Sequence, residues 1–72
     1  MFEVIYRDGT TERIEADECE NYTNSFVFIN RRPVTGNGNE SLTYRDNNGL
    51  KYVRNKIHMI PVDLVRSVKE VV

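Results

Sequence analysis

Residues 41–60, SLTYRDNNGLKYVRNKIHMI, carry the pattern that decides the fold. Two segments of alternating polar and apolar residues flank Asn47-Asn48-Gly49, which predicts a β-hairpin with glycine at a bulge position. The alternation slips after Val53, because apolar residues occupy even positions before it and odd positions after it. We therefore expect a bulge or a bend at 54–56.

This turn determines which residues of the hairpin share a face. A three-residue loop places Tyr44 opposite Tyr52 on one face of the hairpin. Arg45 and Lys51 then lie opposite each other on the other face. We expect the two tyrosines to pack inward and the two cations to face the solvent.

A second hairpin is predicted at the N-terminus, where polar and apolar residues alternate over residues 2–6 and again over 11–16. A two-residue loop would place core residues opposite solvent-facing ones. A loop of Arg7-Asp8-Gly9, with glycine in the left-handed region, instead places Phe2 opposite Ile14. Both hairpins are thus expected to use the same turn design.

The middle of the chain contains its most continuous apolar run, SFVFIN at residues 25–30, which is typical of a central strand covered on both faces. The acidic and polar residues 17–24 before it are expected to form a loop. Pro33 cannot donate to a strand ladder, so it should end the strand. Residues 33–41 are rich in glycine and asparagine, which predicts a flexible loop.

The C-terminal part leaves two alternatives open. Residues 61–64, PVDL, predict a single 3₁₀ turn with proline at its start. The valines of residues 65–72 fit a helical stripe and a strand equally well. We favour a strand, because four short strands need a fifth to close an edge. A β-sheet with a C-terminal helix is the alternative.

These features together resemble the SH3-like and Sm-like small β-barrels, and also short barrel proteins of phages and prophages. The pattern runs from Phe2-x-Val4-x-Tyr6-x-Asp8-Gly9 through Ile14-x-Ala16-Asp17 to Ile60-Pro61. The resemblance implies an all-β fold, a five-stranded antiparallel barrel with one 3₁₀ turn, formed by residues 1–72 as a single domain. The chain has no tryptophan, so it lacks the groove of peptide-binding SH3 domains. It also starts in a strand, whereas Sm-like proteins generally open with a helix.

The chemistry of most enzymes is missing from the sequence. Cys19 and His58 are each the single residue of their type, and no third group ties them together. A zinc site would need more such ligands. Gly36–Ser41 begins like a dinucleotide-binding motif but lacks the last glycine. We expect a non-enzymatic protein without metal or cofactor, with its acidic residues on a solvated face.

Length and composition predict a cytoplasmic protein. The 72 residues contain no apolar stretch near the ~20 residues that a membrane span needs, and the N-terminus does not look like a signal peptide. One cysteine excludes an internal disulfide, which agrees with a reducing compartment.

The net charge of −1 hides an asymmetry along the chain. Residues 1–30 carry two basic and seven acidic residues, whereas residues 31–58 carry six basic and two acidic ones. The basic residues are the candidate partner-binding set: Arg31, Arg32, Arg45, Lys51, Arg54 and Lys56.

We expect this basic set to bind an unknown protein, and the resemblance implies a phage or mobile-element inhibitor or adaptor. Binding of RNA or DNA by the basic region 31–58 is the alternative. The resemblance to Sm-like proteins, which form rings through terminal strands, also implies a homo-oligomer. Its contact would be Val65–Val72 or another strand edge.

Overall fold

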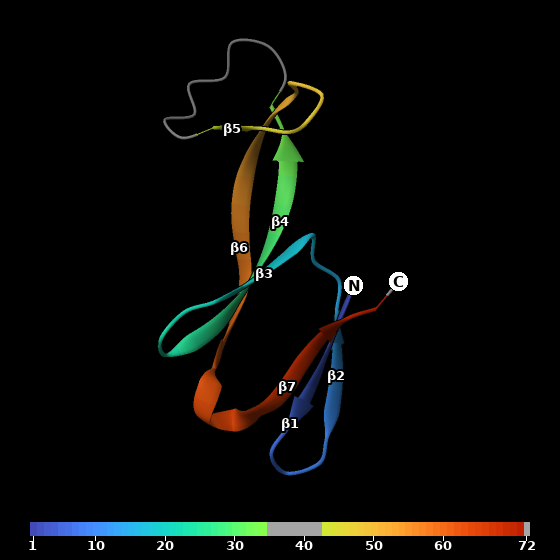
Figure 1. Ribbon diagram of the computed structural model, residues 1–72, viewed down its shortest axis with the longest axis vertical. Helices are drawn as coiled ribbons and strands as arrows, with labels where there is room; N and C mark the ends of the chain where they lie inside the picture. Colours follow the sequence, from blue (N-terminus) through green and yellow to red (C-terminus); the bar gives the residue numbers. More distant parts are fainter. Residues whose placement is uncertain (35–42, 72) are drawn as a thin grey trace.

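The computed structural model describes residues 1–34 and 43–71, and within them the chain is all-β apart from one 3₁₀ turn. The elements are β1 (Phe2–Tyr6), β2 (Thr11–Ile14), β3 (Glu18–Asn21), β4 (Ser25–Pro33), β5 (Tyr44–Arg45), β6 (Lys51–Pro61), η1 (Val62–Leu64) and β7 (Val65–Glu70). They form two antiparallel sheets with the strand orders β2-β1-β7 and β3-β4-β6-β5, one of them curled into a half-barrel (Figure 1). The all-β prediction is confirmed, whereas the described residues hold seven strands and not five.

The N-terminal hairpin has the predicted register. Phe2 lies opposite Ile14, and Gly9 has a φ of +92° in the turn between β1 and β2. On the other face of this sheet, Glu3 of the central strand forms ion pairs with Arg13 of β2 and Lys69 of β7, at 3.7 and 3.4 Å. These ion pairs join all three strands on the side away from the core.

The four-stranded sheet is built around β4, as the apolar run predicts, and β4 ends at Pro33. The hairpin of β5 and β6 also has the expected register, with Tyr44 opposite Tyr52 and a φ of +79° at Gly49. Strand β3 was missed, because residues 17–24 were expected to form a loop. Most of the flexible loop predicted for 33–41, including its glycine-rich motif, lies outside the described residues.

The slip in the pattern of β6 is absorbed by a bulge, slightly later than predicted. His58 lies opposite Phe28, and Lys56 lies opposite the next residue of β4, Ile29. Ile57 therefore has no residue opposite it, whereas the bulge was expected at 54–56. After the 3₁₀ turn the chain enters β7, so the strand alternative is confirmed over Val65–Glu70 and the helix alternative is wrong.

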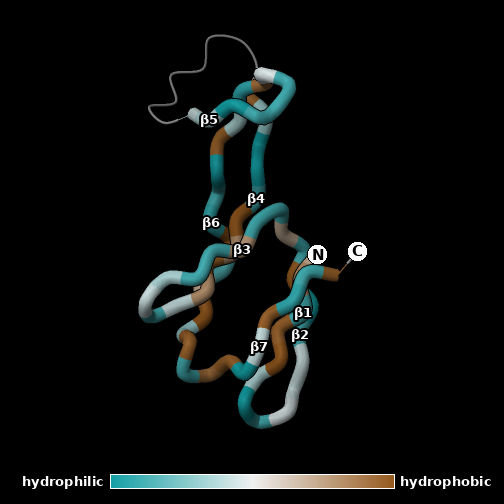
Figure 2. Tube along the Cα trace, in the orientation of Figure 1, coloured by the Kyte–Doolittle hydropathy of each residue, from teal (hydrophilic) through white to brown (hydrophobic). Residues whose placement is uncertain are grey.

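The hydrophobic core lies between the two sheets, in the half of the molecule that contains both chain ends (Figure 2). Phe28 of β4 is fully buried there, and its ring meets that of Phe2 edge-on at 5.7 Å between centroids. The other buried residues of the core cluster come from four strands and from the segment between β2 and β3: Val4, Ile14, Ala16, Ile60 and Val65.

The upper halves of β4 and β6 extend beyond this core as a two-stranded ribbon, with β5 across its end (Figure 1). The molecule is accordingly elongated, with principal extents of 46 × 25 × 15 Å. The ribbon is formed by residues 30–33 and 51–55, which are mainly polar or charged. Neither β1 nor β7 reaches it. Val53 is nevertheless buried within the ribbon, with a relative exposure of 5%.

Candidate functional site

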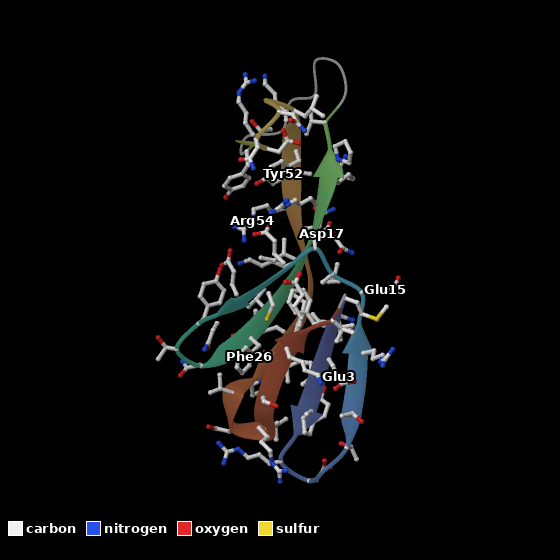
Figure 3. The ribbon with its side chains drawn as sticks, turned by 45° about the vertical axis from the view of Figure 1, so that its right-hand side comes forward. Glu3, Glu15, Asp17, Phe26, Tyr52 and Arg54 are labelled. Carbon is white, nitrogen blue, oxygen red and sulfur yellow. The ribbon has the colours of Figure 1, made fainter. Side chains whose placement is uncertain are left out.

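Tyr44 and Tyr52 lie on the ribbon and not in the hydrophobic core, contrary to expectation. Their rings are stacked, with centroids 5.7 Å apart and planes inclined by 24°, and both side chains are half-buried. Regular pleating does put them on the same face, as predicted. No strand of the second sheet packs against that face at the level of the tyrosines, so they lie outside the hydrophobic core (Figure 3).

Two arginines of the basic set cover the tyrosines. The guanidinium of Arg31 lies 5.1 Å from the centroid of the Tyr52 ring, and that of Arg54 lies 5.3 Å from the Tyr44 ring. Such cation–π contacts are favourable, and more so when partly desolvated. Arg31 and Arg54 are also directly opposite each other in β4 and β6. Like charges in that arrangement repel unless an anion lies between them.

Strand β3 supplies the anions. One carboxylate oxygen of Glu18 is 2.9 Å from Nε of Arg31 and 3.4 Å from Nε of Arg54. Glu20 forms a further ion pair with Arg54. The hydrogen bond to Glu18 raises the pKa of the Arg31 guanidinium. We call Glu18, Glu20, Arg31 and Arg54 the Glu–Arg clasp, because they tie β3 to the base of the ribbon.

Two more members of the basic set lie outside the clasp. The ammonium of Lys56 lies 6.0 Å from the ring of Tyr22, whose hydroxyl donates a hydrogen bond to Glu20. Lys56 is therefore an extension of the same charged face. Arg32 is exposed and lies opposite Val53, on the face away from the tyrosines.

Arg45 and Lys51 are exposed at the end of the ribbon, where they lie opposite each other as predicted. Arg45 donates a hydrogen bond to the carbonyl of Gly49 at 3.0 Å. Asp46 accepts hydrogen bonds from the backbone N–H groups of Asn48 and Leu50, at 2.8 and 2.9 Å, which fixes the turn. We call Arg45, Leu50 and Lys51 the ribbon tip.

Leu50 has 65% of its side chain exposed, although it is a large apolar residue. A shallow pocket of about 160 Å³ lies beside it, lined by Arg31, Pro33, Asp46, Leu50, Lys51 and Tyr52. A single exposed apolar side chain is common on protein surfaces, so Leu50 counts here only together with the pocket and the neighbouring cations. The basic set is thus divided: Arg31 and Arg54 are neutralised by the clasp, whereas Arg45 and Lys51 are exposed at the ribbon tip.

Sequence reasoning did not predict a second pocket, which lies between the β1–β2 turn and η1. It measures about 420 Å³ and is lined by Tyr6, Arg7, Asp8, Thr10, Asp63 and Leu64. The N–H of Arg7 donates to the carbonyl of Leu64 at 2.9 Å, which joins the two walls. The residues come from opposite ends of the chain, so local patterns give no signal for them.

The phenol of Tyr6 in this pocket should titrate unusually late. Its hydroxyl donates a 2.5 Å hydrogen bond to Glu12, and this bond, with burial and the negative charge of Glu12, raises its pKa to about 12. Because the folded-state pKa exceeds the unfolded value, the bond stabilises the fold fully below the unfolded pKa of ~10. Its contribution is lost as the pH rises towards the folded value. Ultraviolet titration should show one late tyrosine, absent from Tyr6→Phe; four tyrosines titrating together would contradict this.

Cys19 and His58, the single thiol and imidazole of the chain, do not lie together in the structure. Cys19 of β3 and His58 of β6 are each opposite Phe28 of β4, which lies in the strand between them. Two strand spacings therefore separate the backbones of Cys19 and His58 by ~10 Å. Burial raises the pKa of the Cys19 thiol, which makes it a poorer nucleophile. Within residues 1–34 and 43–71, no three His, Cys, Asp or Glu side chains are grouped as metal ligands.

No helix in the described part of the chain is long and apolar enough to cross a membrane. Comparisons with protein-family models, curated proteins and solved structures found no match to this chain. Its function must therefore be argued from its own residues.

Proposed function

We propose that this chain is a non-enzymatic binding module that acts by protein–protein contact through the ribbon tip. The observation that carries the proposal is the exposed Leu50, which precedes Lys51 and lies near its cross-strand neighbour Arg45, at the end of a ribbon that projects beyond the core. The Glu–Arg clasp holds the base of this ribbon. An apolar anchor with a charged rim on a preorganised element favours binding at low entropic cost.

We propose that the seven described strands correspond to the five of an SH3-like barrel. β2 and β3 are separated only by residues 15–17 and belong to different sheets, so we infer that they are the halves of one bent strand. β5 is a two-residue extension of the ribbon. Counted in this way the chain has five main strands, the number that the resemblance to SH3-like barrels implies, and one such fold can serve many functions.

The partner that fits the ribbon tip is a protein with an acidic surface next to an apolar cleft. Two cations attract such a surface over a long range, and the leucine side chain supplies area for burial. The resemblance to phage and prophage barrel proteins favours a role as an inhibitor or adaptor.

The outward-facing tyrosines favour RNA or DNA binding as a second candidate. Exposed aromatic rings beside arginines can stack on nucleotide bases. Two features weigh against it: Tyr44 and Tyr52 contact each other and the guanidiniums, and Glu18 neutralises both arginines. The sequence pI of about 5.7 is also far from that of nucleic-acid-binding domains.

A capture experiment with tagged protein from a host-cell lysate, with and without nuclease, tests both candidates. Combining Arg45→Glu with Lys51→Glu should reduce capture of a protein partner about tenfold or more, because both rim charges become repulsive. The matched control combines Arg7→Glu with Arg13→Glu, two exposed cations of the β1–β2 hairpin, and should capture normally.

The nuclease arm separates the candidates. Capture that survives nuclease and is lost in the tip variant supports the protein-binding proposal. Capture that nuclease abolishes, with oligonucleotide binding that weakens steeply with salt, would favour the second candidate. Equal capture by the tip and control variants would show that the ribbon tip is not the interface.

A further inference from the structure

Strand β7 has one edge that no described strand covers. It pairs with β1 along one side, and it is the last strand of its sheet. Exposed edges of this kind are templates for pairing with another chain. No residue of the ribbon tip lies at this edge, so pairing through β7 does not depend on the proposed function.

The hydrogen-bond phase shows which backbone groups point outward from β7. The N–H of Val71 donates to the carbonyl of Met1 at 2.8 Å, so this pair is bonded towards β1. In an antiparallel ladder bonded and non-bonded pairs alternate, so Lys69 and Ser67 also bond towards β1. Val68 and Glu70 lie between them and direct their N–H and C=O groups to the open edge.

This phase restricts how β7 could pair with the β7 of a second copy. A two-fold antiparallel pair centred on Val68 makes two hydrogen bonds between the Val68 residues, because their backbone groups point outward. The same register brings Arg66 of each copy, the residue at the bulge of β7, to the level of Glu70 of the other. Within the described residues neither side chain has an ion-pair partner in its own copy, and both are exposed.

Neighbouring registers are less favourable. A pair centred between Ser67 and Val68 would place Arg66 opposite Lys69, and like charges in direct opposition are destabilising. A pair centred on Ser67 would need backbone groups that are already bonded to β1. Charge and hydrogen-bond phase therefore select the same register.

The lower edge of β6 is a poorer site for a second chain. The bulge at Ile57 interrupts the regular spacing of its outward groups, and Pro61 has no N–H to donate. Bulges and prolines are features that protect strand edges from pairing. The edge of β7 has no proline, and its pairing with β1 is regular over residues 67–70. Its own bulge lies at Arg66, at the end of this regular stretch rather than within it.

We propose that two copies of this chain pair through β7, in the register centred on Val68, as a closed symmetric dimer. The three-stranded sheets of the two copies then form one six-stranded sheet. Val68, which is half-buried against the core, meets its counterpart across the two-fold axis. Because the contact is one short strand per copy, the dimer should be weak and depend on concentration. It would carry two ribbon tips and could bind a multivalent partner.

Charge exchange across the two-fold axis tests this register. Arg66→Glu and Glu70→Arg, each made alone, should weaken dimerisation about tenfold, because each places like charges opposite each other twice. An equimolar mixture of the two variants should regain the wild-type dimer affinity, since both pairs in the mixed dimer are attractive. Sedimentation velocity from micromolar to millimolar concentration measures this, and circular dichroism checks that each variant is folded.

Amide hydrogen exchange supplies a second measurement without any substitution. The N–H groups of Val68 and Glu70 should gain protection as the protein is concentrated, whereas that of Lys69, bonded within one copy, should be protected throughout. A wild-type protein that stays monomeric at millimolar concentration would overturn the proposal. Two other results would also overturn it. One is a mixture of the two variants that dimerises no more tightly than either variant alone, and the other is protection that rises at Ile57 and Met59 of β6 instead.

Discussion

Replacing Phe28 by alanine should lower the free energy of unfolding by about 3–5 kcal/mol, the range for deleting a buried phenylalanine ring. Phe28 is fully buried in the central strand of the larger sheet, and its ring contacts that of Phe2 in the smaller one. The substitution therefore opens a cavity where the two sheets meet. A 72-residue domain has a total stability of roughly 4–11 kcal/mol, so the loss should leave the variant barely folded.

Urea denaturation followed by far-ultraviolet circular dichroism measures this loss. Met59→Ala is the matched control. Met59 of β6 is opposite Val27, the residue next to Phe28, yet it is 64% exposed. We expect a change within about 0.5 kcal/mol for the control, as for other surface positions. Similar stabilities for the two variants would mean that the core does not lie between the sheets.

Both hairpins could be predicted closely from the sequence, because their information is local. The strand period is two, so each choice of loop length places either core or polar residues opposite each other. That test selected the loops ending in Gly9 and Gly49, and both glycines have positive φ values. The run of β4 was recognisable for the same reason, since consecutive apolar residues in a short segment need cover on both faces.

Strand β3 could not be predicted in this way, because its partners are distant in sequence. Its residues ECEN show no apolar alternation and were assigned to a solvated acidic face. Glu18 and Glu20 are instead half-buried, since Arg31 and Arg54 neutralise them from β4 and β6. An ion pair across 13 or 36 residues of sequence leaves no periodic signal.

The two tyrosines illustrate a different limit. The alternation of side chains along a strand correctly places Tyr44 and Tyr52 on one face, together with Arg54. It does not say whether another layer covers that face. The hairpin extends past the second sheet, so its aromatic face packs against arginines rather than valines. The tyrosines lie outside the core because the hairpin extends further than the strands of the second sheet. This difference in length depends on the whole fold and not on the local sequence.

Removing the charge of Glu18 should loosen the base of the ribbon, because this carboxylate lies between two guanidiniums. In Glu18→Gln, Arg31 and Arg54 remain opposite each other in adjacent strands and lose the anion that they share. We expect the free energy of unfolding to fall by about 1–2 kcal/mol, below the upper range for bonds to charged groups because the site is partly hydrated. Glu20 should retain part of the interaction with Arg54.

A double-mutant cycle isolates the ion pair from other effects of the substitutions. Glu18→Gln and Arg54→Gln, measured singly and together, should give a coupling energy of about 0.5–1 kcal/mol, since both side chains are at least three-quarters buried. The control cycle uses Glu3 and Lys69, an ion pair of similar length whose lysine is 65% exposed, and should give less. If the two cycles gave equal coupling, the clasp would be no more than a surface ion pair. The ribbon would then depend on its backbone hydrogen bonds and the stacked tyrosines to hold its direction.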